Sequence, residues 1–481
     1  MQTSDLFNLD FSYLSLPDTF HSLVMPSALD KPELLLFNRQ LADELTLNLP
    51  DAEDAKSILS QLGDFSKSYA QAYAGHQFGH FANLGDGRAI MIGEHITKDQ
   101  NRFDIQIKGS GRTDYSRRGD GRATLKAMLR EYLISEAMHH LKISSSRSLA
   151  VINTNETVYR ETVHQGAALL RVMKSHIRVG TFEYASHLGS LEDLKALTIY
   201  TIKRLYPEIE LDNKAAIHLL KRVMIAQIEL VVNWMRVGFI HGVMNTDNSA
   251  ISGETFDYGP CAFMNAYNPS TVFSSIDQNR RYAYGNQPKI IKWNLACFAE
   301  ALLPIIDENK QKSIELAQEV IDDFDVIWNH KYYEMMLGKV GIKSNNSDHW
   351  ELIDELLRLM QNHKMDYTNT FLALSKEVGS ETKALQSDFF SPWMEKRKRI
   401  LDSLNSNEDA RQLMKANNPV FIPRNHLVEE ALDQAIKGDM STYLELIDVL
   451  SRPYNYQDNR ELFLKPSATT FEENYQTFCG T

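Results

Sequence analysis

Apolar and polar residues alternate strictly over 103–108, and the neighbouring apolar-rich segment 89–96 follows the same period less strictly. A period of two is typical of a β-strand with one buried face, and the KDQN between the segments is a turn sequence, so the pair predicts a β-hairpin. In the second strand, one face carries Phe103, Ile105 and Ile107, and the opposite face carries Asp104, Gln106 and Lys108. The apolar face therefore predicts contact with a core on the side away from Lys108.

One helix interrupts this strand-forming region. Residues 124–141 place apolar side chains at helical spacing, and Thr124 fits the capping position of the first turn. Strands are predicted again at 148–154 and 157–163, joined by Asn155-Glu156, and 166–183 is expected to be extended over most of its length. The pattern indicates a mixed β lobe that contains a single helix.

After about residue 190 the apolar spacing becomes helical, and the longest predicted run is 214–237. The run of helices is broken by 238–290, which is rich in Gly, Asn, Asp, Pro and Ser, and such a long irregular segment is usually functional. Helices are predicted to resume around 293–303, 308–338, 350–362, 390–404 and 427–450. This layout predicts an α+β, protein-kinase-like fold with two lobes.

We divide the chain into four parts on this basis. The parts are an N-terminal arm at 1–60, an N-lobe at 61–185, a helical C-lobe at 186–450 with the loop 238–290, and a tail at 451–481 that contains Cys479. The arm is predicted to lie extended on the body, because prolines repeatedly break its short apolar runs.

Composition excludes several classes of function. The chain has 51 Lys and Arg against 63 Asp and Glu, a net charge of −12, and this acidic balance opposes a nucleic-acid partner. Three cysteines, at 261, 297 and 479, are too few for a disulfide scaffold or a zinc site and indicate a reducing compartment. The N-terminus matches no targeting peptide, and no apolar run approaches the ~20 residues that span a bilayer. We expect a cytoplasmic monomer that binds no membrane.

The central loop carries the first candidate chemistry. It reads HGVMNTDN from His241, and Asn248 lies seven residues after His241, which is the His-to-Asn spacing of the protein-kinase catalytic loop. Asp257-Tyr258-Gly259 follows nine residues later, as the magnesium-binding DFG follows in kinases. Asn248 and Asp257 are therefore candidate ligands for a hard cation. The position of the kinase catalytic base is Val243, and the nearest carboxylate is Asp247. Taken alone, NTDN is more often an Asx-turn and DYG a strand end, because short motifs carry a high false-positive risk.

Two upstream residues fall where a kinase needs them. Lys108 ends a predicted strand, and Glu131 lies on the following helix among apolar neighbours, where a carboxylate needs a partner. The pair matches the Lys–Glu pair that positions nucleotide phosphates in kinases. The alternative is a surface Lys with Glu131 paired elsewhere.

Glycine and arginine accumulate in two stretches, GDGR at 85–88 and KGSGRTDYSRRGDGR at 108–122. Glycines let backbone N–H groups approach phosphate oxygens, and guanidinium groups bind those oxygens bidentately. The arginines are Arg88, Arg112, Arg117, Arg118 and Arg122, and Arg171 and Arg178 follow downstream. On a regular strand a spacing of seven puts these last two on opposite faces, so both reach one nucleotide only if the strand bends or ends between them. We interpret the set as a polyphosphate clamp, against the alternative of a plain Gly-rich turn.

The sequence closely resembles the selenoprotein O family, pseudokinase-fold enzymes that act as protein adenylyltransferases. The resemblance rests on GDGR, KGSGRTDYSRRGDGRA, LLRVMKSHIRVGTFEY, HGVMNTDN with DYGP, RYAYGNQP and the C-terminal FCGT, and covers most of the chain. It implies an inverted ATP whose α-phosphorus faces the acceptor, so that AMP passes to a Ser, Thr or Tyr hydroxyl of a protein. UTP as the donor is an open variant.

The resemblance also implies roles for individual residues. The nucleotide contacts would be Gly85, Gly87, Arg88, Lys108, Asp120, Gly121, Arg171, Arg178 and Asp257. Asn248 and Asp257 would hold Mg²⁺ or Mn²⁺, Glu131 would orient Lys108, and Asp247 would accept the proton of the acceptor hydroxyl. Two other functions stay open: γ-phosphoryl transfer with Asp247 as a displaced base, and a nucleotide-binding scaffold without catalysis.

Cys479 lies where eukaryotic relatives carry selenocysteine. The resemblance suggests a regulatory disulfide, with Cys261 or Cys297 as the partner, and an unpaired tail thiol is the alternative.

Overall fold

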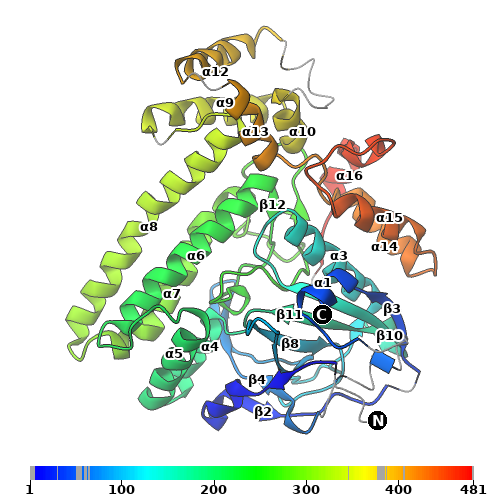
Figure 1. The fold of residues 1–481 in the computed structure, drawn as a ribbon, viewed down its shortest axis with the longest axis vertical. Helices are drawn as coiled ribbons and strands as arrows, with labels where there is room; N and C mark the ends of the chain where they lie inside the picture. The colour runs from blue at the N-terminus through cyan, green and yellow to red at the C-terminus, as the bar shows by residue number, and fades with distance from the viewer. Residues whose placement is uncertain are drawn as a thin grey trace.

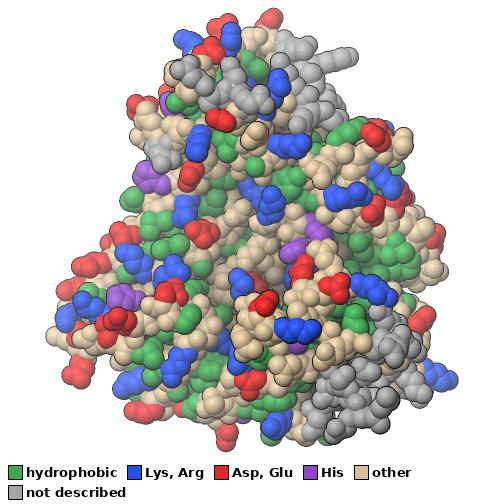
Figure 2. Space-filling model, viewed as in Figure 1, with side chains coloured by type: hydrophobic (Ala, Val, Ile, Leu, Met, Phe, Trp, Pro, Cys, Tyr) green, Lys and Arg blue, Asp and Glu red, His purple; other side chains and the backbone are tan. Residues whose placement is uncertain are grey.

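The computed structural model describes two lobes stacked along the long axis of the molecule (Figure 1). The described residues are 6–29, 31–49, 57–58, 62, 65–344, 346–375, 385, 387–404 and 407–478. The N-lobe is built on an antiparallel sheet and the C-lobe on helices, which confirms the predicted α+β, kinase-like fold. Acidic and basic side chains are interspersed over the visible face (Figure 2).

The N-lobe sheet has nine described strands, and its main path runs β2-β4-β7-β8-β11-β10-β3. The strands are β1 (Leu9–Asp10), β2 (His21–Leu23), β3 (Glu33–Phe37), β4 (Tyr69–Gln71), β7 (Ala89–Ile96), β8 (Arg102–Lys108), β9 (Ala123–Thr124), β10 (Arg147–Tyr159) and β11 (Val163–Met173). β1, β2 and β3 come from the first 60 residues and pair with β7, β4 and β10. The arm therefore contributes strands to the lobe, while its boundary near residue 60 stays a prediction.

The predicted hairpin is confirmed as β7 and β8. Ile105 and Ile107 are buried in an apolar cluster on one face of the sheet. On the other face Asp104, Gln106 and Lys108 are also buried, each at most 5% exposed. This second face is covered by α3 (Leu125–His140), whose first turn is capped by the Thr124 hydroxyl accepting from Ala127 N, as predicted.

Two local predictions were wrong. β10 continues through Asn155-Glu156, because Asn155 adopts a left-handed φ of 54° and a register shift absorbs it; the turn lies at 160–162, where Arg160 N donates to Thr162 O. The extended segment also ends before residue 183. β11 stops at Met173, and α4 (Val179–Leu188) begins directly after Arg178, whose N–H donates to the Thr181 hydroxyl.

The C-lobe is helical, as expected. Its helices are α5 (Leu191–Leu205), α6 (Ala215–Val237), α7 (Gln287–Ile306), α8 (Lys310–Lys339), α9 (Trp350–Asn362), α10 (Tyr367–Leu374), α12 (Ser391–Ser403), α13 (Asn407–Asn417), α14 (Asn425–Ala435), α15 (Ser441–Leu450) and α16 (Thr469–Asn474). α8 has 30 residues against 23 for α6, so the prediction that 214–237 is the longest run was wrong. α8 is mixed in polarity along its length, so its apolar periodicity is weaker than that of α6.

Short elements fill the segment between α6 and α7, which is otherwise irregular. They are β12 (Phe239–Ile240), the 3-10 turn η4 (Thr246–Asn248) and β13 (Ala262–Phe263). A separate hairpin of β5 (Ala74–Gln77) and β6 (His80–Asn83) packs against η4 and α4. One apolar core extends from α3 into the C-lobe helices, so the two lobes share packed side chains. Within the described residues, none of the helices combines the length and the apolar character needed to cross a bilayer.

Candidate active site

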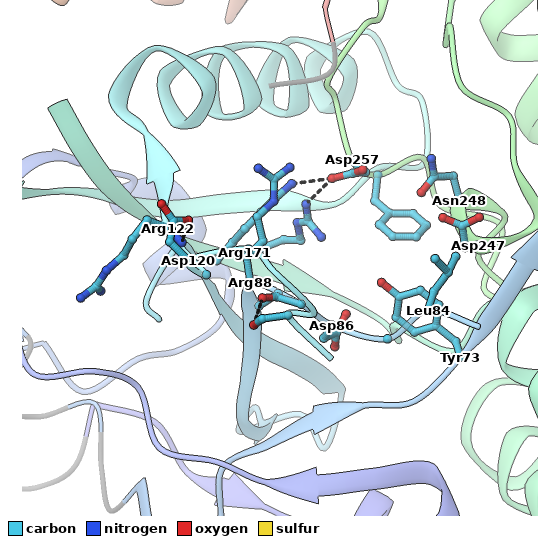
Figure 3. Close-up of a pocket in the computed structure, with 18 of the residues that line it drawn as sticks. Tyr73, Leu84, Asp86, Arg88, Asp120, Arg122, Arg171, Asp247, Asn248 and Asp257 are labelled. Carbon is cyan, nitrogen blue, oxygen red and sulfur yellow. Dashed lines mark hydrogen bonds and ion pairs between the residues drawn. The ribbon is translucent and has the colours of Figure 1, made fainter. Parts of the chain in front are cut away.

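A cavity of about 600 Å³ lies where the N-lobe sheet meets the irregular segment of the C-lobe. Its walls include every residue predicted to contact nucleotide or metal: Gly85, Gly87, Arg88, Lys108, Asp120, Gly121, Arg171, Arg178, Asp247, Asn248 and Asp257. In Figure 3, Asp257 faces Arg171, Asp247 and Asn248 lie beyond it, and Asp120 and Arg122 lie toward the opposite end. Residues that are up to 172 positions apart in the sequence thus share one cavity wall.

Four of the charged residues at the cavity form a group that we call the cavity cluster: Lys108, Glu131, Arg171 and Asp257. Lys108 Nζ lies 2.7 Å from Glu131 Oε2, and the same Nζ contacts Asp257 Oδ1. Arg171 Nε donates to Glu131 Oε1 at 2.7 Å, and its NH2 lies 3.3 Å from Asp257 Oδ1. Two cations and two carboxylates therefore balance, and Glu131 orients both cations.

Electrostatics keeps both carboxylates of the cavity cluster ionised. Burial acts to raise the pKa of Asp257, but Lys108 and Arg171 outweigh it and hold that pKa far below its usual range. Glu131 behaves in the same way, since its buried carboxylate keeps a lowered pKa beside Arg171 and Lys108. The Glu131 side chain is 4% exposed and that of Asp257 is 32% exposed, so Asp257 is the carboxylate that faces the cavity.

Asp247 differs from these carboxylates in having no cation in direct contact with its side chain among the described residues. It is 8% exposed, its Oδ1 has no hydrogen-bond partner, and Arg178 donates only to its backbone carbonyl, at 3.3 Å. Burial raises the pKa of Asp247 to about 7. A carboxylate with a pKa near neutrality can take up a proton at working pH, which is what a general base requires. Val243, at the usual position of the kinase base, is buried and apolar.

Asn248 and Asp257 offer oxygen atoms suited to a hard cation. Asn248 Nδ2 donates to Val243 O at 3.1 Å, which fixes the amide and leaves its Oδ1 as the ligand atom. Asp257 uses Oδ1 for Lys108 and Arg171, and it adopts a left-handed φ of 63°. One amide oxygen and one ionised carboxylate, supplemented by phosphate and water oxygens, match the donor set that Mg²⁺ and Mn²⁺ prefer. The residues present therefore fit such an ion.

The glycine-rich segments lie close to each other at the cavity wall. Gly85 has a φ of +133°, and a Cβ built on it would lie 2.8 Å from Tyr115 Cβ. Gly121 has a φ of +69°, and a Cβ there would collide with the carbonyl of Gly111. Side chains at either position would strain the backbone and push the segments apart, so the glycines shape this wall.

Arg171 and Arg178 reach the same cavity because β11 ends between them, as the sequence argument required. The Arg178 guanidinium lies 4.0 Å from the ring centroid of Tyr73 and 5.0 Å from that of Phe256. It also lies 3.7 Å from Asp86 Oδ1. Sequence reasoning missed Tyr73. It also did not single out Asp86 as a site residue, although Asp86 belongs to the GDGR motif.

The predicted arginine clamp is only partly correct. Arg88, Arg118 and Arg122 line the cavity, but Arg112 and Arg117 do not and bond instead to backbone carbonyls. Arg160, which no motif indicated, lines the opposite end of the cavity from Asp247 and binds Asp120 bidentately at 2.7 and 3.0 Å. This ion pair helps to lower the pKa of Asp120. The Asp120 carboxylate therefore holds the Arg160 guanidinium near the predicted nucleotide site.

Cys479 falls outside the described residues. Cys261 and Cys297 are free buried thiols, and burial raises their pKa values to about 11 and about 12. Thr477 Oγ1 donates to Pro260 O at 2.7 Å, so the described end of the tail contacts the residue next to Cys261. The choice between Cys261, Cys297 and no partner stays a prediction.

Comparison with known proteins identifies close relatives. The family model described as "Protein adenylyltransferase SelO" matches residues 6–451. A protein nucleotidyltransferase YdiU of Pelagibacter ubique (strain HTCC1062) is 50% identical over 480 residues, covering 99% of each chain. The YdiU protein of Bacillus mycoides (strain KBAB4) is 50% identical over 481 residues, covering 99% of this chain and 98% of the relative.

Among solved structures, one match is ROP2 from Toxoplasma gondii, described as a virulence factor with a protein-kinase fold and no enzymatic activity. It is 9% identical, covers 69% of this chain and 87% of that chain, and has a TM-score of 0.25.

Proposed function

The chain belongs to the SelO family of protein adenylyltransferases, and from this premise we propose that it transfers a nucleoside monophosphate to hydroxyl groups of proteins. The donor is ATP, with UTP as the variant, and the acceptors are Ser, Thr or Tyr side chains. Pyrophosphate is the second product. The nucleotide binds inverted relative to its orientation in a kinase, with the α-phosphorus toward the acceptor.

One observation carries this proposal: Asp247, a buried carboxylate whose Oδ1 has no hydrogen-bond partner among the described residues, lines the same cavity as Lys108, Arg171 and Asp257. The combination supplies a proton acceptor on one side and phosphate-binding cations on the other. A scaffold has no chemical need for such a carboxylate, because an unpaired buried acid costs stability. A kinase of the ordinary kind would carry its base at 243, where this chain has valine.

In the proposed reaction, the oxygen of the acceptor hydroxyl attacks the α-phosphorus, and Asp247 accepts the proton of that hydroxyl. A new oxygen–phosphorus bond forms, the bond between the α-phosphorus and the α,β-bridging oxygen breaks, and the electron pair leaves with pyrophosphate. Lys108, Arg171 and Arg88 line the cavity and would bind the phosphate oxygens, so that the charge on the leaving group is met by fixed cations.

Asn248 and Asp257 would hold Mg²⁺ or Mn²⁺, which when bound would neutralise phosphate charge and help orient the triphosphate. Asp257 is suited to this role because its pKa stays low, and the carboxylate is ionised throughout the physiological range. Gly85, Gly87 and Gly121 would let the backbone approach the nucleotide, and Arg178 and Asp120 would add contacts at the two ends of the cavity.

A labelling comparison tests the proposed reaction. Purified protein, Mg²⁺ or Mn²⁺ and a protein acceptor are incubated in separate reactions with ATP labelled at the α-phosphorus, ATP labelled at the γ-phosphorus, and UTP labelled at the α-phosphorus. We expect incorporation from an α-labelled nucleotide only. Label incorporated from the γ position alone would make the protein a kinase, and no incorporation with retained nucleotide binding would make it a scaffold.

Two variants assign the roles within the reaction. Asp247→Asn should lower transfer to a small residual rate while leaving nucleotide binding intact, and Asp257→Ala should abolish metal-dependent transfer. Near-normal transfer by either variant would overturn the role given to that residue.

A further inference from the structure

The β5–β6 hairpin and α4 enclose the backbone around Asp247 from two sides. A Cβ built on Gly75 in β5 would lie 2.9 Å from both Cβ and Cγ of Asp247. A Cβ built on Gly180 in α4 would lie 3.3 Å from Asp247 Cα. Both elements therefore approach this residue more closely than side chains would permit, and η4 is packed between them.

Hydrogen bonds from this enclosure converge on Thr246, the residue before Asp247. The Thr246 hydroxyl donates to Glu183 Oε2 at 2.6 Å and accepts from His76 N at 2.7 Å. The His76 ring completes the network, with Nδ1 2.5 Å from Glu183 Oε1. Glu183 is 1% exposed. Hydrogen bonds to a carboxylate are strong in such a buried environment, and the loss of one destabilises the structure.

Asn245 is held from the same side. Its Oδ1 accepts from Phe78 N at 3.1 Å and from the Tyr282 hydroxyl at 2.7 Å. By contrast, Asp247 Oδ1 makes no hydrogen bond within the described part of the chain. The location of the Asp247 carboxylate is therefore determined by the bonds of its neighbours rather than by its own.

His76, Glu183 and Cys297 also bring three potential metal-ligand atoms within 4.8 Å of one another. Both Glu183 oxygens are already engaged, one by His76 and one by Thr246, and the short His76–Glu183 contact leaves no space for an ion between those two atoms. The cluster is accordingly a hydrogen-bond network.

We propose that Glu183 is a positioning residue for Asp247, acting through the Thr246 hydroxyl, with His76 as its second partner. The inference rests on the proposed function, because it assumes that Asp247 is the proton acceptor. It assigns to α4 and the β5–β6 hairpin the task of holding the catalytic carboxylate toward the acceptor hydroxyl. Displacement of a catalytic group by about 1 Å can cost about 10²-fold in rate.

Thr246→Val tests the inference, because it removes the hydroxyl and keeps the shape of the side chain. We expect kcat to fall about 10²-fold while the Kd for ATP changes less than about threefold, since none of the three network residues lines the cavity. Thr246→Ser should restore most of the activity. Thr198→Val is the matched control, because Thr198 is also buried, at 4% exposed against 0% for Thr246, but its hydroxyl bonds within α5, to Leu194 O; this control should transfer normally.

Glu183→Gln is the second variant, and it decides the matter if Thr246→Val does not fold. The glutamine keeps the size of the side chain but offers only one oxygen acceptor where two are used. It should lower kcat with unchanged nucleotide affinity. Normal kcat in either folded variant, or an equal loss of nucleotide affinity and kcat, would overturn the inference.

A double variant separates this inference from the proposed function. If Thr246 acts through Asp247, adding Thr246→Val to Asp247→Asn should not lower the residual transfer rate further. An additional tenfold loss would show an independent role and overturn the inference. Full activity of Asp247→Asn would overturn the role of Asp247 as proton acceptor and the inference with it, whereas a nearly inactive Asp247→Asn with a fully active Thr246→Val would overturn only the inference. The proposed function itself fails if the wild-type protein incorporates no label from an α-labelled nucleotide.

Discussion

The polar face of β8 bears two charged groups of the same composition at its two ends. The cavity cluster lies at Lys108. At the other end is a group that we call the α5 cluster: Glu94, Arg102, Asp104 and Arg204. Each group contains two cations and two carboxylates, and Gln106 on the same face lies between them. The difference between the clusters lies in what the carboxylates face.

In the α5 cluster both carboxylates are enclosed. The side chains of Glu94 and Asp104 are 0% and 6% exposed, and Arg204 from α5 contacts both of them. Glu94 also accepts from Tyr13 N at 2.8 Å, and Asp104 accepts from His176 N at 2.6 Å. Every bond joins one part of the fold to another, so the cluster ties α5 and the N-terminal segment to the sheet.

In the cavity cluster, Asp257 remains one-third exposed and turns toward the cavity, while Lys108 and Arg171 contact only one of its oxygens. Balanced charge alone therefore does not distinguish a structural cluster from a functional one. The exposed carboxylate of Asp257 distinguishes the cavity cluster, because its second oxygen can still bind a ligand.

The largest effect is expected from Arg204→Met in the α5 cluster. The substitution leaves Asp104 without its arginine and Glu94 with Arg102 only, and removing one partner of a buried ion pair costs about 3–5 kcal/mol. The free energy of unfolding, measured by urea titration, should fall by that amount. Transfer per folded molecule at low temperature should stay within about threefold of normal. A decrease in the free energy of unfolding of less than about 1 kcal/mol would contradict the structural role given to this cluster.

Lys108→Met should produce the opposite result. Arg171 still contacts both Glu131 and Asp257, so the fold should lose less than in Arg204→Met. Transfer should fall about 10²- to 10³-fold, because a fixed cation that meets developing phosphate charge is removed. Parallel urea titrations and kinetic assays of the two variants measure both quantities. If Lys108→Met is as destabilised as Arg204→Met, the contrast between the clusters is wrong.

The sequence predicted the Lys108–Glu131 pair of the cavity cluster and no pair of the α5 cluster. Lys108 and Glu131 follow from strand alternation, helical spacing and the kinase-like arrangement of elements, all of which are local patterns. Arg204 meets Asp104 from 100 positions away, on a helix whose own pattern indicates only which face is apolar. No local signal distinguishes an arginine that anchors a sheet from one that faces water.

The same limit explains the site residues that were missed or misplaced. Arg160 reaches Asp120 only because β10 continues past Asn155 and turns at 160–162, and a left-handed asparagine reads as a turn in sequence. The burial of Asp247 depends on Gly75 and Gly180, which come from two other elements. Motifs indicated which residues carry chemistry, whereas packing between distant elements sets their environment.

A pH profile sharpens the distinction between Asp247 and the cavity cluster. Asp247 must be ionised to accept a proton, and its raised pKa of about 7 means that transfer should fall about tenfold per unit as the pH drops below 7. A bound metal ion lowers this pKa and moves the limb to lower pH. The ionisation of Asp257 adds nothing to the pH dependence over pH 6–8, because its pKa lies far below that range. Arg204→Met should keep the same profile. A rate that stays constant from pH 8 down to the ordinary aspartate pKa of about 4 would exclude Asp247 as the base.

The smallest effect is expected at Glu254, a buried carboxylate without an ion pair in the described residues. It accepts from Lys174 N at 3.1 Å and from the Ser252 hydroxyl at 2.7 Å, and burial raises its pKa to about 7. A carboxyl whose pKa is higher in the folded state favours folding most below about pH 4.5, and this contribution is lost as the pH rises through 7. Glu254→Gln stays neutral, so it should be more stable than the wild-type protein by about 1 kcal/mol at pH 8, with the difference shrinking toward pH 5. Melting temperatures measured across this range test the prediction. A wild-type protein that is more stable than Glu254→Gln at pH 8 would mean that hydrogen bonds alone can offset the burial of this charge, in contrast to Glu131 and Asp257, whose pKa values are lowered by neighbouring cations.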